Sequence, residues 1–230
     1  MSTRIAKHDA ITLVGGGAPH RATLVRALAR APRLIAVDGG ADAALALGMM
    51  PDLAVGDFDS ISDDARAALG PERLLHTPDQ ETTDFDKALA AVPAPLVLAV
   101  GFSGARLDHT LAALSTLARN PGRRVIIDSG HDLCLLCPPR LALDLPRDTR
   151  VSLYPLGPVR CPSRGLVWPT DHLHFTPLGR IGTSNAAIGG VVTLAPDAPA
   201  MLLILPVDTL DALIAALSAA PPWPDCARAQ

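Results

Sequence analysis

Short apolar runs alternate with helical patterns through the first half of the chain. Each run is bounded by turn residues, which is typical of a buried strand. Between the runs, apolar residues recur at helical spacing, for example over residues 20–30, 41–48 and 63–69. This alternation predicts a mostly parallel sheet with helices on both faces. The predicted strands are Ile11–Val14, Leu34–Val37, Leu53–Val55, Leu96–Val100, Val125–Ile127 and Leu133–Cys137.

The pattern changes near residue 145. Prolines and glycines become more frequent there, and short alternating runs such as TRVSLYPL and GGVVTLAP predict antiparallel strands. The last regular stretch, DTLDALIAALSAA, predicts a helix that begins at Asp208 or Thr209. We therefore expect an α/β domain over residues 1–144 and an all-β domain with a C-terminal helix over residues 145–230.

Composition narrows the class of protein. Of the 230 residues, 19% are charged and 49% are apolar, which is typical of a folded globular chain. The formal net charge of −3 argues against nucleic acid or an anionic membrane as a partner. No apolar run is long enough to span a bilayer, and the first ten residues lack the apolar core of a secretion signal, so we expect a cytoplasmic location.

The four cysteines do not suggest a disulfide scaffold, because they are few and scattered. Cys134 and Cys137 form a CxxC pair inside an apolar run, with no second Cys or His pair nearby. We therefore expect buried core thiols there in preference to a metal or redox site. Cys161 and Cys226 stand alone.

Acidic residues follow two of the predicted strands directly. Asp38 ends the second strand and precedes Gly39, while Asp57 and Asp59 follow the third strand after a glycine. Parallel strands end at one edge of a sheet, where α/β proteins bind ligands. The period of two along an extended chain also puts Asp57 and Asp59 on one side. Carboxylates this close favour a hard cation such as Mg²⁺ between them. Turn formation and helix capping explain the same residues without a ligand.

A polar loop precedes the next predicted helix. Thr82 or Thr83 is a typical N-cap, and Asp84 falls in the first turn, where the helix dipole favours a negative charge. That explanation needs no function. The loop just upstream, which includes Gln80, suits contact with a polar ligand.

Arg106, Asp108 and His109 cluster at the start of the helix that follows the strand Leu96–Val100. An arginine fork suits phosphate, although a surface Arg–Asp pair explains the same residues. The leucines of this helix form one apolar stripe, which predicts a buried face, and they are Leu107, Leu111, Leu114 and Leu117.

Gly15–Gly17 connects the first strand to the first helix. A strand, a glycine turn and a helix start can form a cradle for a phosphate or a nucleotide. The spacing is not that of a dinucleotide or P-loop fingerprint, so a plain tight turn is an equal alternative.

In the second half, Trp168 and the dipeptide Ser184-Asn185 are candidates for ligand contact. A single Trp in a small β domain usually belongs to the core. It can equally be a stacking plate for an aromatic or cationic ligand.

Several of these segments, taken in order, resemble the thiamine pyrophosphokinase (thiamine diphosphokinase) family. The resemblance rests on DGGAD at 38–42, PDLAVGDFDSI at 51–61, DQETTDFDKAL at 79–89, GARLDHTLAAL at 104–114, and the later GLVWP and TSN. It implies an α/β catalytic domain followed by a β-sandwich-like domain, a homodimer, and transfer of the pyrophosphoryl group of ATP to thiamine with release of AMP.

The resemblance also implies roles for individual residues. It assigns Mg²⁺ and phosphate positioning to Asp38, Asp57, Asp59 and Asp84, and catalysis to Asp57, Asp59, Asp84 and Arg106. It assigns contacts with ATP to Asp38, Gly39, Gln80, Thr83, Arg106, Asp108 and His109. It assigns thiamine binding, at the dimer interface, to Trp168, Ser184 and Asn185.

Three alternatives compete with this function. A related pyrophosphokinase acting on a pterin alcohol would keep the acidic motifs, but the Trp and Ser-Asn signals favour thiamine. A non-catalytic nucleotide or thiamine sensor on the same fold would be expected to have lost metal carboxylates, and all four are present. An NAD-binding domain lacks support because its glycine fingerprint is absent.

Overall fold

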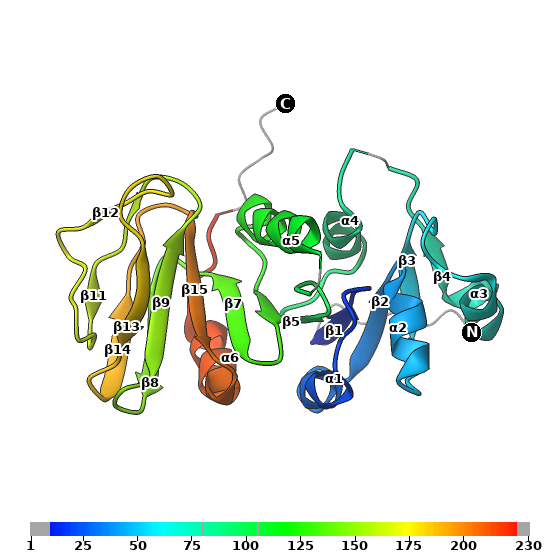
Figure 1. The fold of residues 1–230 in the computed structure, drawn as a ribbon, viewed down its shortest axis with the longest axis horizontal. Coiled ribbons are helices and arrows are strands. Elements are labelled where there is room, and N and C mark those ends of the chain that lie inside the picture. The colour runs from blue at the N-terminus through cyan, green and yellow to red at the C-terminus, as the bar shows by residue number, and fades with distance from the viewer. Residues whose placement is uncertain (1–9, 80, 105, 225–230) are drawn as a thin grey trace. The chain divides into compact units, whose positions relative to one another are not determined.

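The computed structural model describes residues 10–79, 81–104 and 106–224, and these residues form two compact units. The first unit comprises residues up to Thr116 together with Val125–Gly130. The second comprises Leu117–Arg124 and the chain from His131 onward. Figure 1 shows the elements of both units as a ribbon.

The sheet of the first unit has six parallel strands in the order β6-β5-β1-β2-β3-β4. The fully buried pattern of β1, β5 and β6 reflects their continuous apolar runs. The strands are β1 Ile11–Val14, β2 Arg33–Val37, β3 Leu53–Gly56, β4 Leu74–His76, β5 Val97–Val100 and β6 Val125–Asp128.

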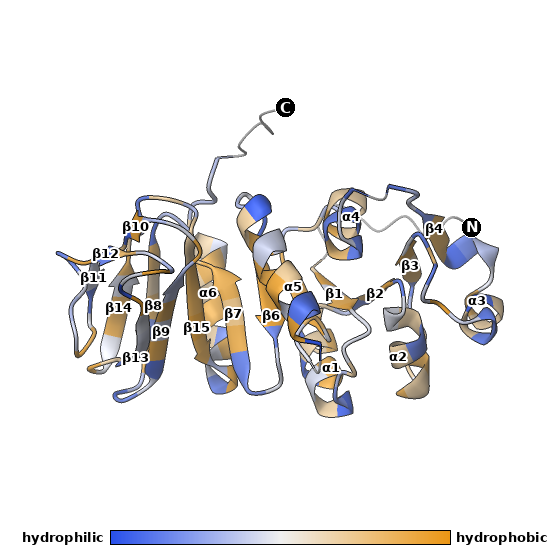
Figure 2. Ribbon diagram, turned by 45° about the horizontal axis from the view of Figure 1, so that its top comes forward, coloured by the Kyte–Doolittle hydropathy of each residue, from blue (hydrophilic) through white to orange (hydrophobic). Residues whose placement is uncertain are grey.

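Helices cover both faces of this sheet. Figure 1 shows α4 and α5 along one face and α1 and α2 along the other. Figure 2 shows hydrophobic colours on the strands and hydrophilic patches on α1, α3 and α5. The helices are α1 Arg21–Leu28, α2 Gly40–Ala46, α3 Asp63–Leu69, η1 Pro71–Arg73, α4 Asp84–Ala91 and α5 Leu107–Arg119.

The second unit is built mainly from antiparallel strands. A four-stranded sheet has the order β13-β9-β15-β7, a three-stranded sheet has the order β11-β14-β8, and β10 pairs with β12. Helix α6 packs against β8. The elements are β7 Asp132–Leu136, β8 Leu141–Leu145, β9 Arg150–Pro155, β10 Val159–Arg160, β11 Ser163–Arg164, β12 His174–Phe175, β13 Gly182–Ala186, β14 Gly190–Leu194, β15 Met201–Pro206, η2 Val207–Thr209 and α6 Leu210–Ala219.

The predicted fold class is confirmed: a parallel sheet with helices on both faces is followed by antiparallel sheets. The chain passes from the first compact unit to the second at residue 130, whereas the sequence predicted domains of 1–144 and 145–230. The difference arises at β7, whose apolar sequence resembles the parallel strands before it. In the structure β7 pairs antiparallel with β15, about 70 residues later along the chain, so it belongs to the second unit.

The leucine stripe of α5 does not form the buried face that the spacing predicts. Leu117 is buried, but Leu107 is 69% exposed and Leu111 is 55% exposed. The prediction of a fully buried stripe was therefore wrong at the first two turns of α5. Among the described residues, no helix combines the length and apolarity needed to cross a membrane.

Cys137 is a buried free thiol, as predicted, whereas Cys134, for which burial was also predicted, is half-buried. Cys161 is a buried free thiol as well. Burial raises the pKa of Cys134 and of Cys161 to about 12. Burial raises the pKa of Cys137 as well. These thiols are thus protonated and unreactive at neutral pH, which fits structural roles. Cys226 lies outside the described residues.

Candidate functional site

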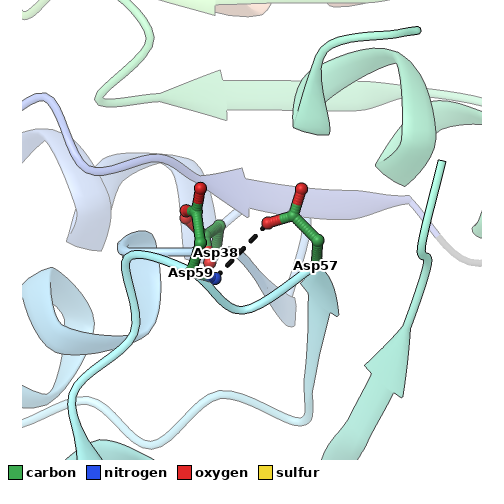
Figure 3. A group of neighbouring side chains, drawn as sticks. All are labelled: Asp38, Asp57 and Asp59. Atoms are coloured by element: carbon green, nitrogen blue, oxygen red, sulfur yellow. Dashed lines mark hydrogen bonds between the residues drawn. The ribbon is translucent and has the colours of Figure 1, made fainter. Parts of the chain in front are cut away.

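Three carboxylates meet at the carboxyl ends of β2 and β3. Asp38 directly follows β2, and Asp57 and Asp59 follow β3, which pairs with β2 in parallel. One carboxylate oxygen from each residue lies within 4.8 Å of the others (Figure 3). The prediction that adjacent strand ends bring these acids together is therefore confirmed. We call these three residues the acidic cluster.

The backbone around the acidic cluster is shaped for close approach. Asp38 has φ +45° and Phe58 has φ +65°, both in the left-handed region that few side chains adopt. A Cβ on Gly56 would lie 3.0 Å from the Cβ of Asp38, so glycine is needed where β3 passes that residue. Strained backbone of this kind is concentrated at functional sites.

Phe58 fixes the turn between the two acids of the third strand. Its side chain is 6% exposed, its ring lies 5.9 Å from the ring of His76, and the Arg66 guanidinium lies 5.6 Å from its centroid. Arg66 also donates to the Phe58 carbonyl oxygen. Phe58 is buried, and Asp57 and Asp59 both lie in the acidic cluster. Because Phe58 has a positive φ, this segment is a turn, and the two acids are not placed by the period of two of an extended strand.

Asp38 is the most buried acid of the cluster, at 7% exposed. Burial raises the pKa of its carboxyl group, the backbone N–H of Gly39 offsets part of that effect, and the nearby charge of Asp84 adds to it. Within the described chain, Asp38 Oδ1 is buried and has no hydrogen-bond donor. A buried carboxylate oxygen without a donor costs free energy, and a cation would compensate it.

The other two acids are oriented by short-range hydrogen bonds. The backbone N–H of Asp59 donates to Asp57 Oδ1 at 3.4 Å, drawn as the dashed line in Figure 3. The Ser60 hydroxyl donates to Asp59 Oδ1 at 2.8 Å. Asp59 is exposed, so the acidic cluster opens to solvent on its side.

Lys87 also lies at this site, although no pattern in the sequence marked it as a functional residue. Its Nζ lies 2.9 Å from Asp57 Oδ2 and 2.9 Å from Asp84 Oδ1, and the residue is 7% exposed. Burial lowers the pKa of Lys87, but the hydrogen bonds that its ammonium donates to Asp57 and Asp84, together with their charges, outweigh burial, so its pKa lies above the ordinary value. Lys87 thus holds an oxygen of Asp84, and Asp84 is not one of the three residues of the acidic cluster.

Thr83 acts as the N-cap of α4, one of the two residues predicted for that role. Its Oγ1 accepts the backbone N–H of Asp86 at 3.2 Å and donates to Asp86 Oδ2 at 2.7 Å. The Thr116 hydroxyl on α5 donates to the same Asp86 oxygen at 3.1 Å. This buried network fixes the start of α4, on which Asp84 and Lys87 lie. Gln80 lies outside the described residues.

Arg106 and Asp108 form an exposed ion pair near the start of α5. The distance from Arg106 Nη2 to Asp108 Oδ2 is 2.6 Å, and their side chains are 68% and 66% exposed. The hydrogen bond raises the pKa of Arg106 and lowers the pKa of Asp108. His109 is also exposed. This is the surface pair that the sequence left as an alternative, and contact with a phosphate stays a prediction.

A cavity of about 230 Å³ lies beside the glycine turn that follows β1. The backbone N–H of Gly17 donates to Gly101 O at 2.9 Å, and a Cβ on Gly17 would lie 2.6 Å from that oxygen. The strand order reverses between β1 and β5, which is where open α/β sheets bind ligands. The lining comes from three strand ends: Gly17, Ala18, Pro19, His20, Thr23, Val100, Gly101, Ser103, Gly104, Asp128 and Ser129.

Asp128 closes the cavity floor through an ion pair. Its carboxylate is 2% exposed and accepts Arg26 Nη2 at 2.9 Å and Nε at 3.1 Å. The backbone N–H of Gly130 donates to it at 2.8 Å. These contacts use the carboxylate fully, so Asp128 is a structural residue of the cavity wall.

In the second unit Trp168 is 61% exposed, so within this chain it is not a core residue. Its loop is held by Asn185, whose Oδ1 accepts the Trp168 N–H at 3.2 Å and whose Nδ2 donates to the Trp168 carbonyl at 2.7 Å. Ser184 has φ +63°, and its N–H donates to Ser152 Oγ at 3.0 Å. Asn185 therefore holds the backbone of Trp168, and its side-chain amide is occupied by these contacts.

Comparison with known proteins supports the resemblance seen in the sequence. Residues 24–127 match the family model described as "Thiamin pyrophosphokinase, catalytic domain". Thiamine pyrophosphokinase 1 of Arabidopsis thaliana is 28% identical over 166 residues, which cover 64% of this chain and 62% of that protein. Thiamine pyrophosphokinase of Bacillus subtilis (strain 168) is 26% identical over 166 residues, with coverage of 67% and 78%. The alignment thus spans about three fifths of the Arabidopsis relative.

Solved structures extend the similarity of fold along the chain. Thiamin pyrophosphokinase from Candida albicans superposes with a TM-score of 0.74 at 15% identity, covering 90% of this chain and 96% of that one. Yeast thiamin pyrophosphokinase gives a TM-score of 0.72 at 16% identity, with coverage of 93% and 90%. The predicted family resemblance is confirmed, and the fold is shared over both units.

Proposed function

We propose that this chain, a relative of the thiamine pyrophosphokinases, transfers the pyrophosphoryl group of ATP to the hydroxyl of thiamine. The hydroxyl oxygen would attack the β-phosphorus, and the bond from that phosphorus to the α,β-bridging oxygen would break. The hydroxyl proton is released, and the products are thiamine diphosphate and AMP. The observation that carries the proposal is the acidic cluster within the segment that matches the catalytic-domain family.

The acidic cluster suits Mg²⁺. Asp38 offers a buried oxygen without a donor, and Asp57 and Asp59 add two more carboxylates within 4.8 Å. Mg²⁺ prefers such oxygen ligands and keeps water and phosphate positions open. When bound, it would neutralise charge on the triphosphate as AMP leaves. The family resemblance also assigns Mg²⁺ positioning to Asp84, which here forms an ion pair with Lys87.

The nucleotide would bind along the same edge of the sheet. The 230 Å³ cavity at the β1–β5 switch point is a site for part of its nucleoside end. Arg106 would exchange Asp108 for a phosphate oxygen, since its guanidinium is exposed and already paired with a carboxylate. Gly39 and Thr83 flank the acidic cluster, and Gln80 and His109 complete the ATP contacts that the resemblance implies.

Thiamine would stack on Trp168. The indole is exposed, the backbone of Trp168 is held by Asn185, and the thiazolium of thiamine is a cation that an indole face attracts. Ser184 lies next to Asn185 on strand β13. The second unit also exposes apolar residues, which supports a homodimer that covers them: Val167, Ile181, Ile188 and Val191. Unpaired cysteines fit a reducing compartment such as the cytoplasm.

Product analysis tests the proposal. Purified chain with ATP, Mg²⁺ and thiamine should yield thiamine diphosphate and AMP in equal amounts, resolved by chromatography. Asp57→Asn should lose more than about 100-fold of this activity, because it removes a ligand charge at nearly constant volume. Asp63→Asn, at the exposed start of α3, is the matched control and should retain activity. Full activity in Asp57→Asn would remove the metal assignment.

A further inference from the structure

Lys87 is a buried ammonium group between two carboxylates. Its Nζ lies 2.9 Å from Asp57 Oδ2 and 2.9 Å from Asp84 Oδ1, so one cation holds an oxygen of each residue. The side chain is 5% exposed, against 11% for Asp57 and 33% for Asp84. A lysine this buried is rare unless it is paired.

The position of Lys87 is fixed by helix α4. The backbone N–H of Lys87 donates to Thr83 O at 2.9 Å, and α4 packs on β3, the strand that leads to Asp57. Lys87 and Asp84 are three residues apart, which puts them on one side of the helix. The ammonium is therefore held at this place by the fold itself.

Lys87 also determines how Asp57 faces the acidic cluster. Because Lys87 holds Oδ2, the oxygen that remains is Oδ1, which accepts the Asp59 N–H. Figure 3 shows this oxygen directed toward Asp38 and Asp59. Asp57 therefore presents a single oxygen to the acidic cluster, and the space between Asp57 and Asp84 is filled by Nζ.

Charge supports the same conclusion. Asp38, Asp57, Asp59 and Asp84 crowd one edge of the sheet, and like charges at this spacing repel unless cations intervene. In two-metal sites a second ion supplies that compensation. Here Lys87 supplies a permanent positive charge at the Asp57–Asp84 side.

We propose that Lys87 is a positioning residue that takes the place of a second divalent cation, so that the acidic cluster is a site for one metal ion. Asp84 then serves as the second anchor of Lys87 and is not a metal ligand. This inference rests on the proposed function, which gives the acidic cluster its metal.

Counting bound Mn²⁺ tests the inference without substrates. Mn²⁺ prefers the same oxygen ligands as Mg²⁺ and is counted by its electron paramagnetic resonance signal in equilibrium titrations. The full chain should bind one Mn²⁺. Lys87→Met removes the charge but keeps most of the stem, so Asp57 and Asp84, no longer bridged by the ammonium, should bind a second ion. Lys87→Met combined with Asp84→Asn should return to one, because the second site loses a ligand.

Control variants separate this effect from a general change of charge or fold. Lys87→Arg keeps the cation and should bind one Mn²⁺. Arg150→Met breaks an ion pair with Asp132 in the second unit and should also bind one. Added Mn²⁺ should raise the melting temperature of Lys87→Met more than that of the unsubstituted chain, because a second ion binds only the folded variant.

Four results would overturn the inference: two Mn²⁺ in the unsubstituted chain, one in a folded Lys87→Met, two in the double variant, or a loss of Mn²⁺ binding in Asp84→Asn. The Asp84→Asn measurement keeps the test decisive if Lys87→Met does not fold. Failure of thiamine turnover would leave these counts unchanged, so the two proposals are tested separately.

Discussion

Asp38→Asn should stabilise the metal-free chain while abolishing its metal binding. Asp38 is 7% exposed and its Oδ1 has no donor in the described part of the chain, so the folded state carries a buried, uncompensated charge. Asparagine has the same shape and tolerates the positive φ of +45° at this position. The substitution therefore removes the charge with little steric change.

The size of the effect follows from the removed charge, because an unsatisfied buried polar group costs about 1–3 kcal/mol and a charged one costs more, and asparagine keeps the polar group without the charge. The backbone N–H of Gly39 offsets part of that cost, so we expect a gain of about 1–2 kcal/mol. For a chain of this length each kcal/mol shifts the melting temperature by about 2–4 °C, which gives about 2–8 °C.

The gain should depend on pH in a definite direction. The pKa of Asp38 is raised above 3.8 in the folded state, mainly by burial. The folded state then holds the proton more tightly, so stability falls as the pH rises from 3.8 through the folded-state pKa. The advantage of asparagine should be absent below pH 3.8, grow through that window and be complete above it.

Thermal melts in a chelator, monitored by circular dichroism between about pH 3.5 and 8, provide the assay. Asp59→Asn, an exposed acid of the same cluster, is the matched control and should give no gain. Excess Mn²⁺ should raise the melting temperature of the unsubstituted chain but not that of Asp38→Asn. An Asp38→Asn protein that melts no higher than the parent at neutral pH would refute the argument from burial.

Three further predictions concern other parts of the chain. Asp128→Asn should destabilise the first unit by about 2–4 kcal/mol in chemical denaturation, because it breaks the buried pair with Arg26; a change below about 0.5 kcal/mol would contradict this. Trp168→Ala should raise the KM for thiamine about 10-fold, from a loss of about 1–2 kcal/mol, and leave the KM for ATP unchanged; equal changes for both substrates would count against stacking. Cys161, whose pKa burial raises to about 12, should react with a disulfide reagent at pH 8 only after unfolding when tested in a Cys226→Ser background; rapid labelling of the native chain would show that its burial is wrong.

The acidic cluster could be predicted from the sequence because its geometry follows from local rules. Each acid directly follows an apolar strand, and neighbouring parallel strands end at one edge, so Asp38, Asp57 and Asp59 had to converge. The N-cap at Thr83 is equally local, since the hydroxyl bonds the backbone three residues ahead.

Lys87 could not be predicted in the same way. In the sequence it is one of three charged residues in the first turn of a helix, and its partner Asp57 is 30 residues away. Only the packing of α4 on β3 brings them together. A lysine three residues after an acid in a predicted helix was the signal available, since that spacing puts the two side chains on one side.

Features that depend on distant parts of the chain could not be predicted from local sequence rules either. Strand β4 is short and carries little apolar signal, so no strand was predicted at Leu74–His76. The exposed Leu107 and Leu111 show that an apolar stripe predicts a buried face only where another element covers it. The backbone contacts of Trp168 likewise involve Asn185, which lies 17 residues later along the chain, so local sequence rules could not give them.

The most direct test of the proposed pyrophosphoryl transfer is AMP release from ATP and Mg²⁺ by the purified chain, measured with thiamine, with a pterin alcohol and with no acceptor. We expect AMP only in the reaction that contains thiamine, and we expect the rate of its release to fall to background in Asp57→Asn. Release with the pterin alcohol alone would keep the acidic cluster and overturn the acceptor. No release with any acceptor would contradict the proposed transfer itself.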